Sequence, residues 1–432
     1  MYRRYLAAAA TAGLLALAAC SSSPAQSSAS SSSSAGGASK ATLTYLTFRT
    51  PDLTAGFWST SIAAAEKSVP GVTIKQDVAP TTDRDSYAKQ LLQSGEFPDL
   101  LQSITPSLYT SAGLLTPYPA SWINANFILP NNIKGKDYIP PTNSQIIPLV
   151  YYNKTLFAKA GITTPPTTWA QFMADSAKLK AAGIVPIELG GHDSFAAAMP
   201  LTGALSADVL GSNPNWIQQR YAGTVKFSDP DVVAAATKMR TLVADNYFEP
   251  DALSVSYAQS ITNFNDGKAA MYPMGSWYLG SIPKNEWDNI GVFPWPTNNG
   301  SLVIPFSLGG SMAVSSKATN QADAFKFAES WSLNPDNLKA LISGDGAFPM
   351  IKGKSLASYG LTLSPAFGDS YSYVTATNTK VSSMSWATND DALPGNVTSD
   401  FDAAAQALFS SSNVLGQMQQ LDQDWANATA SS

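Results

Sequence analysis

The chain has 432 residues, of which 44% are hydrophobic, 10% aromatic and only 13% charged. Its formal net charge of −5 would repel a polyanion overall, so we expect no nucleic-acid partner. With one cysteine (Cys20) and one histidine (His192), the body of the chain lacks the residues for a disulfide or a cysteine-ligated metal, and we expect no metal and no cofactor.

The first 20 residues have the pattern of an export signal. Arg3 and Arg4 precede the apolar run 6–19, which is too short to span a hydrocarbon core of about 30 Å comfortably. The run ends in LAAC at 17–20, which resembles the lipobox of bacterial lipoproteins. We therefore expect 1–19 to be a signal peptide and Cys20 to be lipidated, with an ordinary secretory signal or an uncleaved anchor as alternatives.

Residues 21–39 are mostly serine, with alanine, glycine, glutamine and one proline, and they cannot support a packed core. We expect 20–41 to be a lipidated flexible tether. A linker of this length and composition would hold the folded body on the order of 25 Å from the membrane.

Alternating strands and helices open the folded body. Apolar patterning and turn residues predict strands at 41–48, 72–78 and 99–103 and helices at 57–67 and 84–93. This αβ alternation predicts a largely parallel, covered sheet. Ligands of such sheets bind at the carboxyl ends of the strands.

The same mixed pattern continues further along the chain. Strands are predicted at 145–152, 184–189, 269–273, 291–293 and 311–314, and helices at 154–160, 232–245 and 256–266. Thr168 and Gln171 form a capping box that opens another helix, which ends at Gly183. Beyond about residue 321 the pattern is mostly helical. No internal repeat argues for a propeller or a solenoid.

Three strings carry a family resemblance: LQSGEFPDLLQ at 92–102, PLVYYNKTLFAKAG at 148–161 and FNDGKAAMYPMGSW at 264–277. In this order and spacing, together with VFPWP at 292–296, the glycine pair at 309–310 and GAFP at 346–349, they resemble the extracellular solute-binding proteins of family 1. These are sugar-type binding lipoproteins of ATP-binding-cassette importers. The resemblance extends over most of residues 41–432.

The resemblance implies an α/β, two-lobed periplasmic-binding-protein-like fold with hinge strands and an interlobe cleft that holds the solute. By this analogy the N-lobe is 42–149 plus 291–345 and the C-lobe is 150–290 plus 346–432, with a hinge near Val150. The protein would be lipid-anchored at the extracellular face of the cell membrane, capture a sugar or small oligosaccharide, and deliver it unaltered to the permease subunits. We expect a monomer without enzymatic activity.

Trp277 is the leading candidate for a ligand contact. It follows Gly275 and Ser276 directly after a predicted strand, where glycine allows close backbone approach and the indole offers a flat apolar face to a pyranose ring. In the family an aromatic residue at this place commonly makes that contact. Simple core packing of Trp277 is the alternative.

Short polar side chains at strand ends are the candidates for hydrogen bonds to sugar hydroxyls. These are Arg49, Asp52, Gln102, Ser103, His192 and Asp193. Arg49 and Asp52 could instead pair with one another, and His192 could be a surface residue. Further candidates are Trp386, as a second stacking platform in a polar loop, Trp58, for which a core role is equally open, and Gly309 and Gly310, for close backbone approach.

Two other functions remain open from the residues alone. A secreted glycoside hydrolase needs only two carboxylates, although the sequence places no such pair together. A receptor of the same architecture could bind a non-sugar solute such as a peptide, a polyamine or an amino acid. Acidic stripes would favour a polyamine, and none stands out.

Overall fold

The computed structural model describes residues 41–430. The predicted signal peptide, Cys20 and most of the predicted tether lie outside this range. The described residues form one compact unit, so the lobe boundaries given above stay predictions. Within the described range, no helix is both long and apolar enough to cross a membrane.

The first sheet contains the N-terminal strands. Its order is β2 (Val72–Val78), β1 (Ala41–Thr47), β3 (Leu100–Gln102), β13 (Met312–Ser315) and β4 (Leu115–Thr116). β1 runs parallel to β2 and β3, as predicted, but β13 is antiparallel to β3 and β4. The expectation of a largely parallel sheet therefore holds for β2, β1 and β3 but is wrong for β13 and β4. The reason is that β13 enters the sheet from a distant part of the chain.

The second sheet has the order β11 (Ile290–Pro294), β8 (Leu149–Asn153), β10 (Ala269–Met274) and β9 (Val185–Ile187). Only β9 and β10 are parallel; β8 is antiparallel to both its neighbours. Every residue of β10 is buried, and the six-residue run AAMYPM has the continuous apolar character of a strand covered on both faces.

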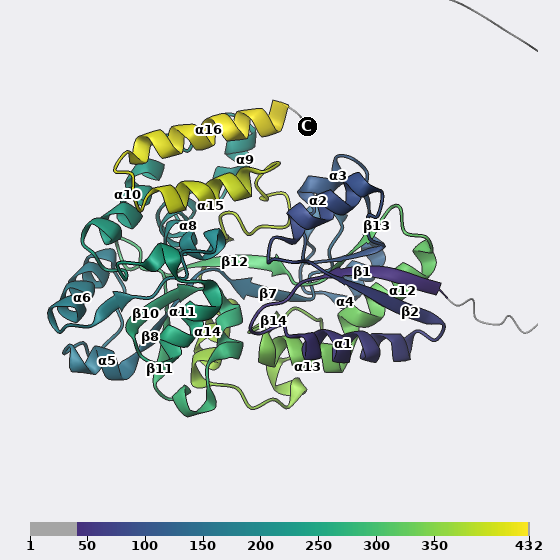
Figure 1. The fold of residues 1–432 in the computed structure, drawn as a ribbon, viewed down its shortest axis with the longest axis horizontal. Helices are drawn as coiled ribbons and strands as arrows, with labels where there is room; N and C mark the ends of the chain where they lie inside the picture. Colours follow the sequence, from purple (N-terminus) through teal and green to yellow (C-terminus); the bar gives the residue numbers. More distant parts are fainter. Residues whose placement is uncertain (1–40, 431–432) are drawn as a thin grey trace, which may run out of the picture. The chain divides into compact units, whose positions relative to one another are not determined.

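A third sheet lies between these two in Figure 1, with the order β14 (Phe348–Pro349), β7 (Asn143–Ile146), β12 (Val303–Gly309) and β15 (Thr379–Ser382). The single strand predicted at 145–152 is wrong: β7 and β8 belong to different sheets and are separated by a cis peptide bond before Pro148. β12, which the sequence analysis missed, leads directly into β13. The chain thus enters the first and the second sheet from the third, where hinge strands are predicted.

Helices cover these sheets, and a short hairpin, β5 (Asn132–Ile133) with β6 (Lys136–Asp137), lies apart. The helices are α1 (Ala55–Ser68), α2 (Arg84–Ser94), α3 (Ser107–Thr110), α4 (Ala120–Asn126), α5 (Lys154–Lys159), α6 (Trp169–Ala181), α7 (Ser194–Ala197), α8 (Met199–Leu205), α9 (Trp216–Tyr221), α10 (Pro230–Ala244), α11 (Tyr257–Asn265), α12 (Gln321–Leu333), α13 (Pro335–Gly344), α14 (Pro365–Thr375), α15 (Val397–Ala407) and α16 (Val414–Ala430). A π-turn, Ser206–Leu210, continues α8, and 3-10 turns include Ser276–Ser281.

Local sequence signals explain where several helices begin. Thr168 accepts a hydrogen bond from the Gln171 amide at 3.2 Å while the Gln171 side chain accepts one from the Thr168 amide at 3.2 Å, which confirms the predicted capping box of α6. Asp83 is the N-cap residue of α2, and its side chain accepts a hydrogen bond from the Ser86 backbone amide. The C-terminal α15 and α16 pack together and close the apolar core around α8 and α10, as Figure 1 shows.

Candidate ligand-binding site

A pocket of about 360 Å³ opens among elements attached to all three sheets. Its walls come from the loop after β1, the start of α2, the end of β3, the turn between β12 and β13, the loop 385–388 and the first turns of α15. The size is typical of a small-molecule site. The carboxyl ends of β1 and β3 both reach the pocket, where strand-end ligands are expected.

Two indoles form an apolar surface in the pocket. The ring centroids of Trp277 and Trp386 lie 5.0 Å apart with the planes at 43°, and Phe195 packs edge-on against Trp386 at 6.1 Å. The Ser307 hydroxyl donates a hydrogen bond to the Trp386 carbonyl at 2.8 Å, which holds the loop 385–388 against β12. Both indoles line the cavity, so the pocket has the flat apolar faces that a sugar ring can stack on.

The end of β3 and the β12–β13 turn form one polar wall. The Gln102 amide donates to the Gly310 carbonyl at 3.1 Å, while its oxygen accepts from the Tyr45 hydroxyl at 2.5 Å. Gly310 has φ +77°, and a Cβ there would lie 2.2 Å from the Asn143 amide nitrogen. Ser103 has φ +48° although it is not glycine. Strained backbone of this kind is common at functional sites.

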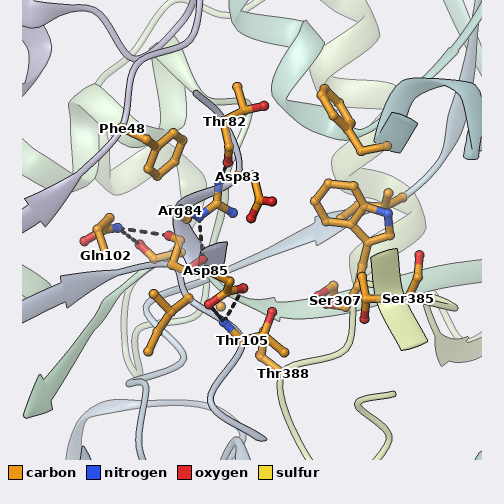
Figure 2. Close-up of a pocket in the computed structure, with 18 of the residues that line it drawn as sticks. Phe48, Thr82, Asp83, Arg84, Asp85, Gln102, Thr105, Ser307, Ser385 and Thr388 are labelled. Carbon is orange, nitrogen blue, oxygen red and sulfur yellow. Dashed lines mark hydrogen bonds between the residues drawn. The ribbon is translucent and has the colours of Figure 1, made fainter. Parts of the chain in front are cut away.

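Arg84 is packed into the wall next to this turn (Figure 2). Its guanidinium lies 4.1 Å from the centroid of the Phe48 ring and donates hydrogen bonds to the Ser103 carbonyl at 2.7 Å and the Thr82 carbonyl at 3.3 Å. Burial lowers the pKa of Arg84, and the neighbouring carboxylates oppose that shift. The side chain therefore braces the pocket wall through neutral acceptors.

Two buried carboxyl groups lie on one side of the pocket. Asp52 accepts hydrogen bonds from the Tyr257 hydroxyl at 3.1 Å and from the Ser281 hydroxyl. Burial raises the pKa of Asp52 to about 6 despite these bonds. The Gln145 amide donates to the Asp345 carboxyl at 3.2 Å, and burial, followed by the charge of Asp52, raises the pKa of Asp345 well above its usual range.

Three further carboxyl groups lie near the start of α2 and on α15. Asp83 accepts from the Ser86 amide at 3.0 Å, and Asp85 accepts from the Thr105 amide at 3.2 Å. In Figure 2, Asp83, Arg84 and Asp85 lie on one side of the pocket and Ser307 and Ser385 on the other. Asp402, on α15, is 9% exposed, and its Oδ1 has no hydrogen-bond partner. The pocket is thus rich in groups that accept or donate hydrogen bonds.

The structure brings several of the predicted site residues into this one pocket. The candidates that line it are Trp277, Trp386, Asp52, Gln102, Ser103, Gly309 and Gly310. They come from positions between 52 and 386 of the sequence. The remaining six candidates lie outside the lining, and each has another structural role or is exposed.

Trp58 lies in the core and not in the pocket. It is fully buried, makes an edge contact with Tyr45 at 6.2 Å, and donates its indole N–H to the Phe48 carbonyl. Ser276 is also fully buried and accepts from the Ile146 amide at 3.4 Å. A Cβ on Gly275 would lie 2.2 Å from the Trp277 ring, so this glycine makes room for the indole and not for a ligand.

Arg49, His192 and Asp193 also lie outside the lining. Arg49 is exposed, and it does not pair with Asp52, whose carboxylate is bound by Tyr257. The His192 side chain is 67% exposed, which fits the alternative that His192 is a surface residue. Asp193 accepts from the Tyr257 amide at 2.7 Å, which fixes the start of α11.

The sequence analysis missed several lining residues, including Phe48, Arg84, Asp345 and Asp402. Asp402 carried a usable signal, because it shares the buried face of α15 with Phe401 and Ala405, where an unpaired carboxyl is unexpected. Asp345 carried none, since it follows a helix end like many surface aspartates. Over residues 41–430 no group of three or more histidine, cysteine or acidic side chains could hold a metal ion.

Comparison with known proteins gives a family match and a fold match. A model of the bacterial extracellular solute-binding protein family matches residues 50–339. Among curated relatives, a multiple sugar-binding protein of Streptococcus mutans serotype c is 24% identical over 282 residues, which cover 60% of this chain. The chain spans 64% of the length of that relative.

Solved structures resemble the chain over most of its length. A chitin oligosaccharide binding protein has a TM-score of 0.78 and 24% identity, covering 91% of this chain and 100% of its own. A sugar transporter from Bacillus licheniformis in complex with stachyose has a TM-score of 0.70 and 18% identity, covering 89% and 100%. These similarities establish the α/β, two-lobed fold.

Proposed function

Because the chain belongs to the bacterial extracellular solute-binding protein family, we propose that it is the substrate-binding component of an ATP-binding-cassette importer and captures a sugar or small oligosaccharide. The observation that carries this proposal is the pair of indoles, Trp277 and Trp386, 5.0 Å apart in a pocket ringed by short polar side chains. The sugar-binding activities named for the relative and for the solved structures agree with it.

Binding alone explains how such a site would work. Sugar C–H faces stack on the indoles, and hydroxyl groups exchange hydrogen bonds with amide, hydroxyl and carboxyl groups such as those of Gln102 and Asp52. A ligand that contacts both lobes favours the closed state, and only that difference in free energy shifts the population. The protein would then present the closed form to the permease and release the sugar unaltered.

The family and the leader support a proposal about where the protein is located. The family is extracellular, and we propose that Cys20 is lipidated and anchors a monomeric protein at the outer face of the cell membrane. The serine-rich tether would let the folded body reach a permease in the same membrane.

A thermal-shift screen against mono- and oligosaccharides tests the proposed function. A sugar that binds only the native state raises the melting temperature in proportion to the logarithm of its concentration above Kd. We expect at least one sugar to do so and to change the tryptophan fluorescence. If no sugar of a broad panel binds, the proposal is wrong.

The same panel separates binding from hydrolysis. Five aspartates line the pocket, and paired carboxyl groups are what a glycoside hydrolase uses. We expect no release of reducing ends from oligosaccharides incubated with the protein. Steady release of reducing ends at a rate proportional to protein concentration would show that the protein is a glycoside hydrolase and not a receptor.

A further inference from the structure

Within residues 41–430, the carboxyl groups around the pocket form no close ion pair, although the buried guanidinium of Arg84 interacts electrostatically with Asp83, Asp85 and Asp345. Those that line it are Asp52, Asp83, Asp85, Asp345 and Asp402. The ion pairs formed within residues 41–430, at nitrogen to oxygen distances of up to 4.0 Å, involve none of these five. The charge of Arg84 favours the carboxylate form of Asp345, whereas no cation is among the groups that shift the pKa of Asp52 or Asp402.

The two cationic side chains of the pocket are engaged elsewhere. Arg84 donates to the carbonyls of Ser103 and Thr82, and Lys89 donates to the Asn396 side-chain oxygen at 2.6 Å. All three acceptors are neutral. An anionic ligand would have to break these bonds and approach the aspartates, so the pocket is unsuited to a phosphate or carboxylate group.

Asp402 differs from the other four aspartates because it makes no hydrogen bond of its own. It lines the pocket from α15, it is nine-tenths buried, and its Oδ1 has no partner. Burial, followed by the charge of Asp83, raises the pKa of Asp402 to about 8. A buried acceptor without a partner destabilises the protein, so a ligand that supplies a donor gains affinity there.

We propose that the Asp402 side of the pocket is a subsite for a protonated amino group, and that the ligand is a sugar carrying a free amine. This inference rests on the proposed function, because the indoles supply the contact for the ring. The ammonium group would donate to the unpartnered Oδ1 of Asp402 and would lie in the field of Asp83, forming a charge-assisted hydrogen bond.

Among residues 41–430 no cation forms an ion pair with Asp402, and Lys89, which lines the same pocket, is held by Asn396 at the start of α15. α7, which packs against α15, has the sequence SFAA and no ionisable side chain. On the other side, α16 contributes Asp424, whose charge acts on Asp400, and Asp422, which pairs with Arg220 at 3.1 Å. Asp83, at the start of α2, is the charged group that acts on Asp402. An ammonium ion at Asp402 would therefore lie in the field of Asp83, while Lys89 of the same pocket is held by Asn396.

A matched series of β-1,4-linked disaccharides tests the inference: cellobiose, chitobiose and N,N′-diacetylchitobiose, which carry a hydroxyl, an amine or an acetamide at C2, with cellobiouronic acid as an anionic member. At pH 7 we expect chitobiose to bind about tenfold more tightly than cellobiose, because a hydrogen bond to a charged group is stronger than a neutral one. Cellobiouronic acid should bind more weakly than cellobiose.

Calorimetry gives a second, independent measurement. When an ammonium group binds at Asp402 it favours the carboxylate, so chitobiose should release protons at pH 7 and the observed enthalpy should depend on the ionisation enthalpy of the buffer. Cellobiose should show no such dependence. This measurement needs no variant, so it does not depend on how a substitution folds.

The variant Asp402→Asn should remove the preference for chitobiose over cellobiose, since an amide still accepts a hydrogen bond but carries no charge. Asp400→Asn, on the same helix but outside the pocket lining, is the control and should keep the preference.

The outcomes separate this inference from the proposed function. If other sugars bind but chitobiose shows neither tighter binding than cellobiose nor proton release, the inference is overturned and the proposed function stands. Tighter binding of cellobiouronic acid would also overturn it. So would saturable binding of spermidine without any effect of chitobiose, which would favour a polyamine receptor and would contradict the sugar-binding proposal as well if no sugar bound.

Discussion

At the scale of single residues, the missing side chain of Gly275 leaves the space that the Trp277 indole occupies. The indole folds over Gly275, where a Cβ would lie 2.2 Å away, and its ring centroid lies 5.0 Å from that of Trp386 in the pocket. We expect Trp277→Ala to weaken binding of the sugar found in the thermal-shift screen by ~1–2 kcal/mol, because stacking area is lost. Titration calorimetry measures this change.

Trp287→Ala is the matched control for that variant. Trp287 is partly buried, donates its indole N–H to the Ile282 carbonyl at 3.1 Å, and lies outside the pocket lining. Sugar affinity should be unchanged in this variant. If Trp277→Ala bound the sugar as tightly as the control does, Trp277 would have to be removed from the site.

Glu188 and Glu249 form a buried carboxyl pair away from the pocket. Glu188 is fully buried at the end of β9, where the bridge from Ile187 to Phe248 brings Glu249 near it. Burial, followed by the charge of Glu249, raises the pKa of Glu188 to about 9. The folded protein therefore holds a proton that the unfolded chain, with an ordinary value of 4.5, has lost at neutral pH.

This shift predicts the pH dependence of stability. A raised pKa stabilises the fold fully below about pH 4.5, and that contribution is lost progressively as the pH rises towards 9. Glu188→Gln cannot ionise, so its melting temperature should fall less than that of the wild type between pH 5 and pH 9. Glu96→Gln, at an exposed position, should follow the wild type. Parallel curves for all three proteins would show that Glu188 ionises without cost.

At the scale of elements, the capping box of α6 is a local device that should act on stability alone. The Thr168 hydroxyl accepts the Gln171 amide hydrogen bond at 3.2 Å, and Thr168→Ala leaves that amide without its cap. We expect a loss of about 1 kcal/mol in the free energy of unfolding, measured by urea denaturation. Thr262→Ala, on the exposed side of α11, should change it by less than about 0.5 kcal/mol. Equal effects of the two substitutions would contradict a special role for the cap.

The turn between β12 and β13 joins the third sheet to the first and forms part of the pocket wall. Gly310→Ala meets two obstacles: φ is +77°, and the new Cβ would lie 2.2 Å from the Asn143 amide. Gly95→Ala has nearly the same φ, +79°, with nothing within 4 Å. We expect Gly310→Ala to destabilise the protein by at least about 1 kcal/mol more than Gly95→Ala, because of overpacking. Equal losses in denaturation would mean that Asn143 moves aside freely.

At the scale of the whole molecule, the proposed lipid anchor at Cys20 would determine where the binding site operates. Cys20 and the serine-rich stretch precede the first strand, and they lie outside the described residues. We expect Cys20→Ala to move the protein from the membrane fraction to the soluble fraction, as detected by immunoblot after cell fractionation. A protein that stayed in the membrane fraction would favour an uncleaved helical anchor.

The sequence by itself determined the local elements. Strands β1, β2 and β10 and helices α1, α2, α6 and α10 lie where periodicity, caps and glycine stops predict them, because those signals act between residues a few positions apart. The motif strings were enough to identify the family and, with it, the two-lobed fold. The third string contains Trp277, and the polar loop around position 386 made Trp386 a second candidate; both line the pocket.

Only the tertiary structure decided which residues meet. It separates β7 from β8 and pairs β7 with β12, and it places Trp58 in the core and Asp402 in the pocket wall. Periodicity does not reveal these relations: β7 pairs with a strand more than a hundred residues away, and the burial of Trp58 depends on how the first strand and helix pack. The charge of the pocket is the clearest case: five aspartates, spread from residue 52 to residue 402, become one acidic site only when the chain is folded.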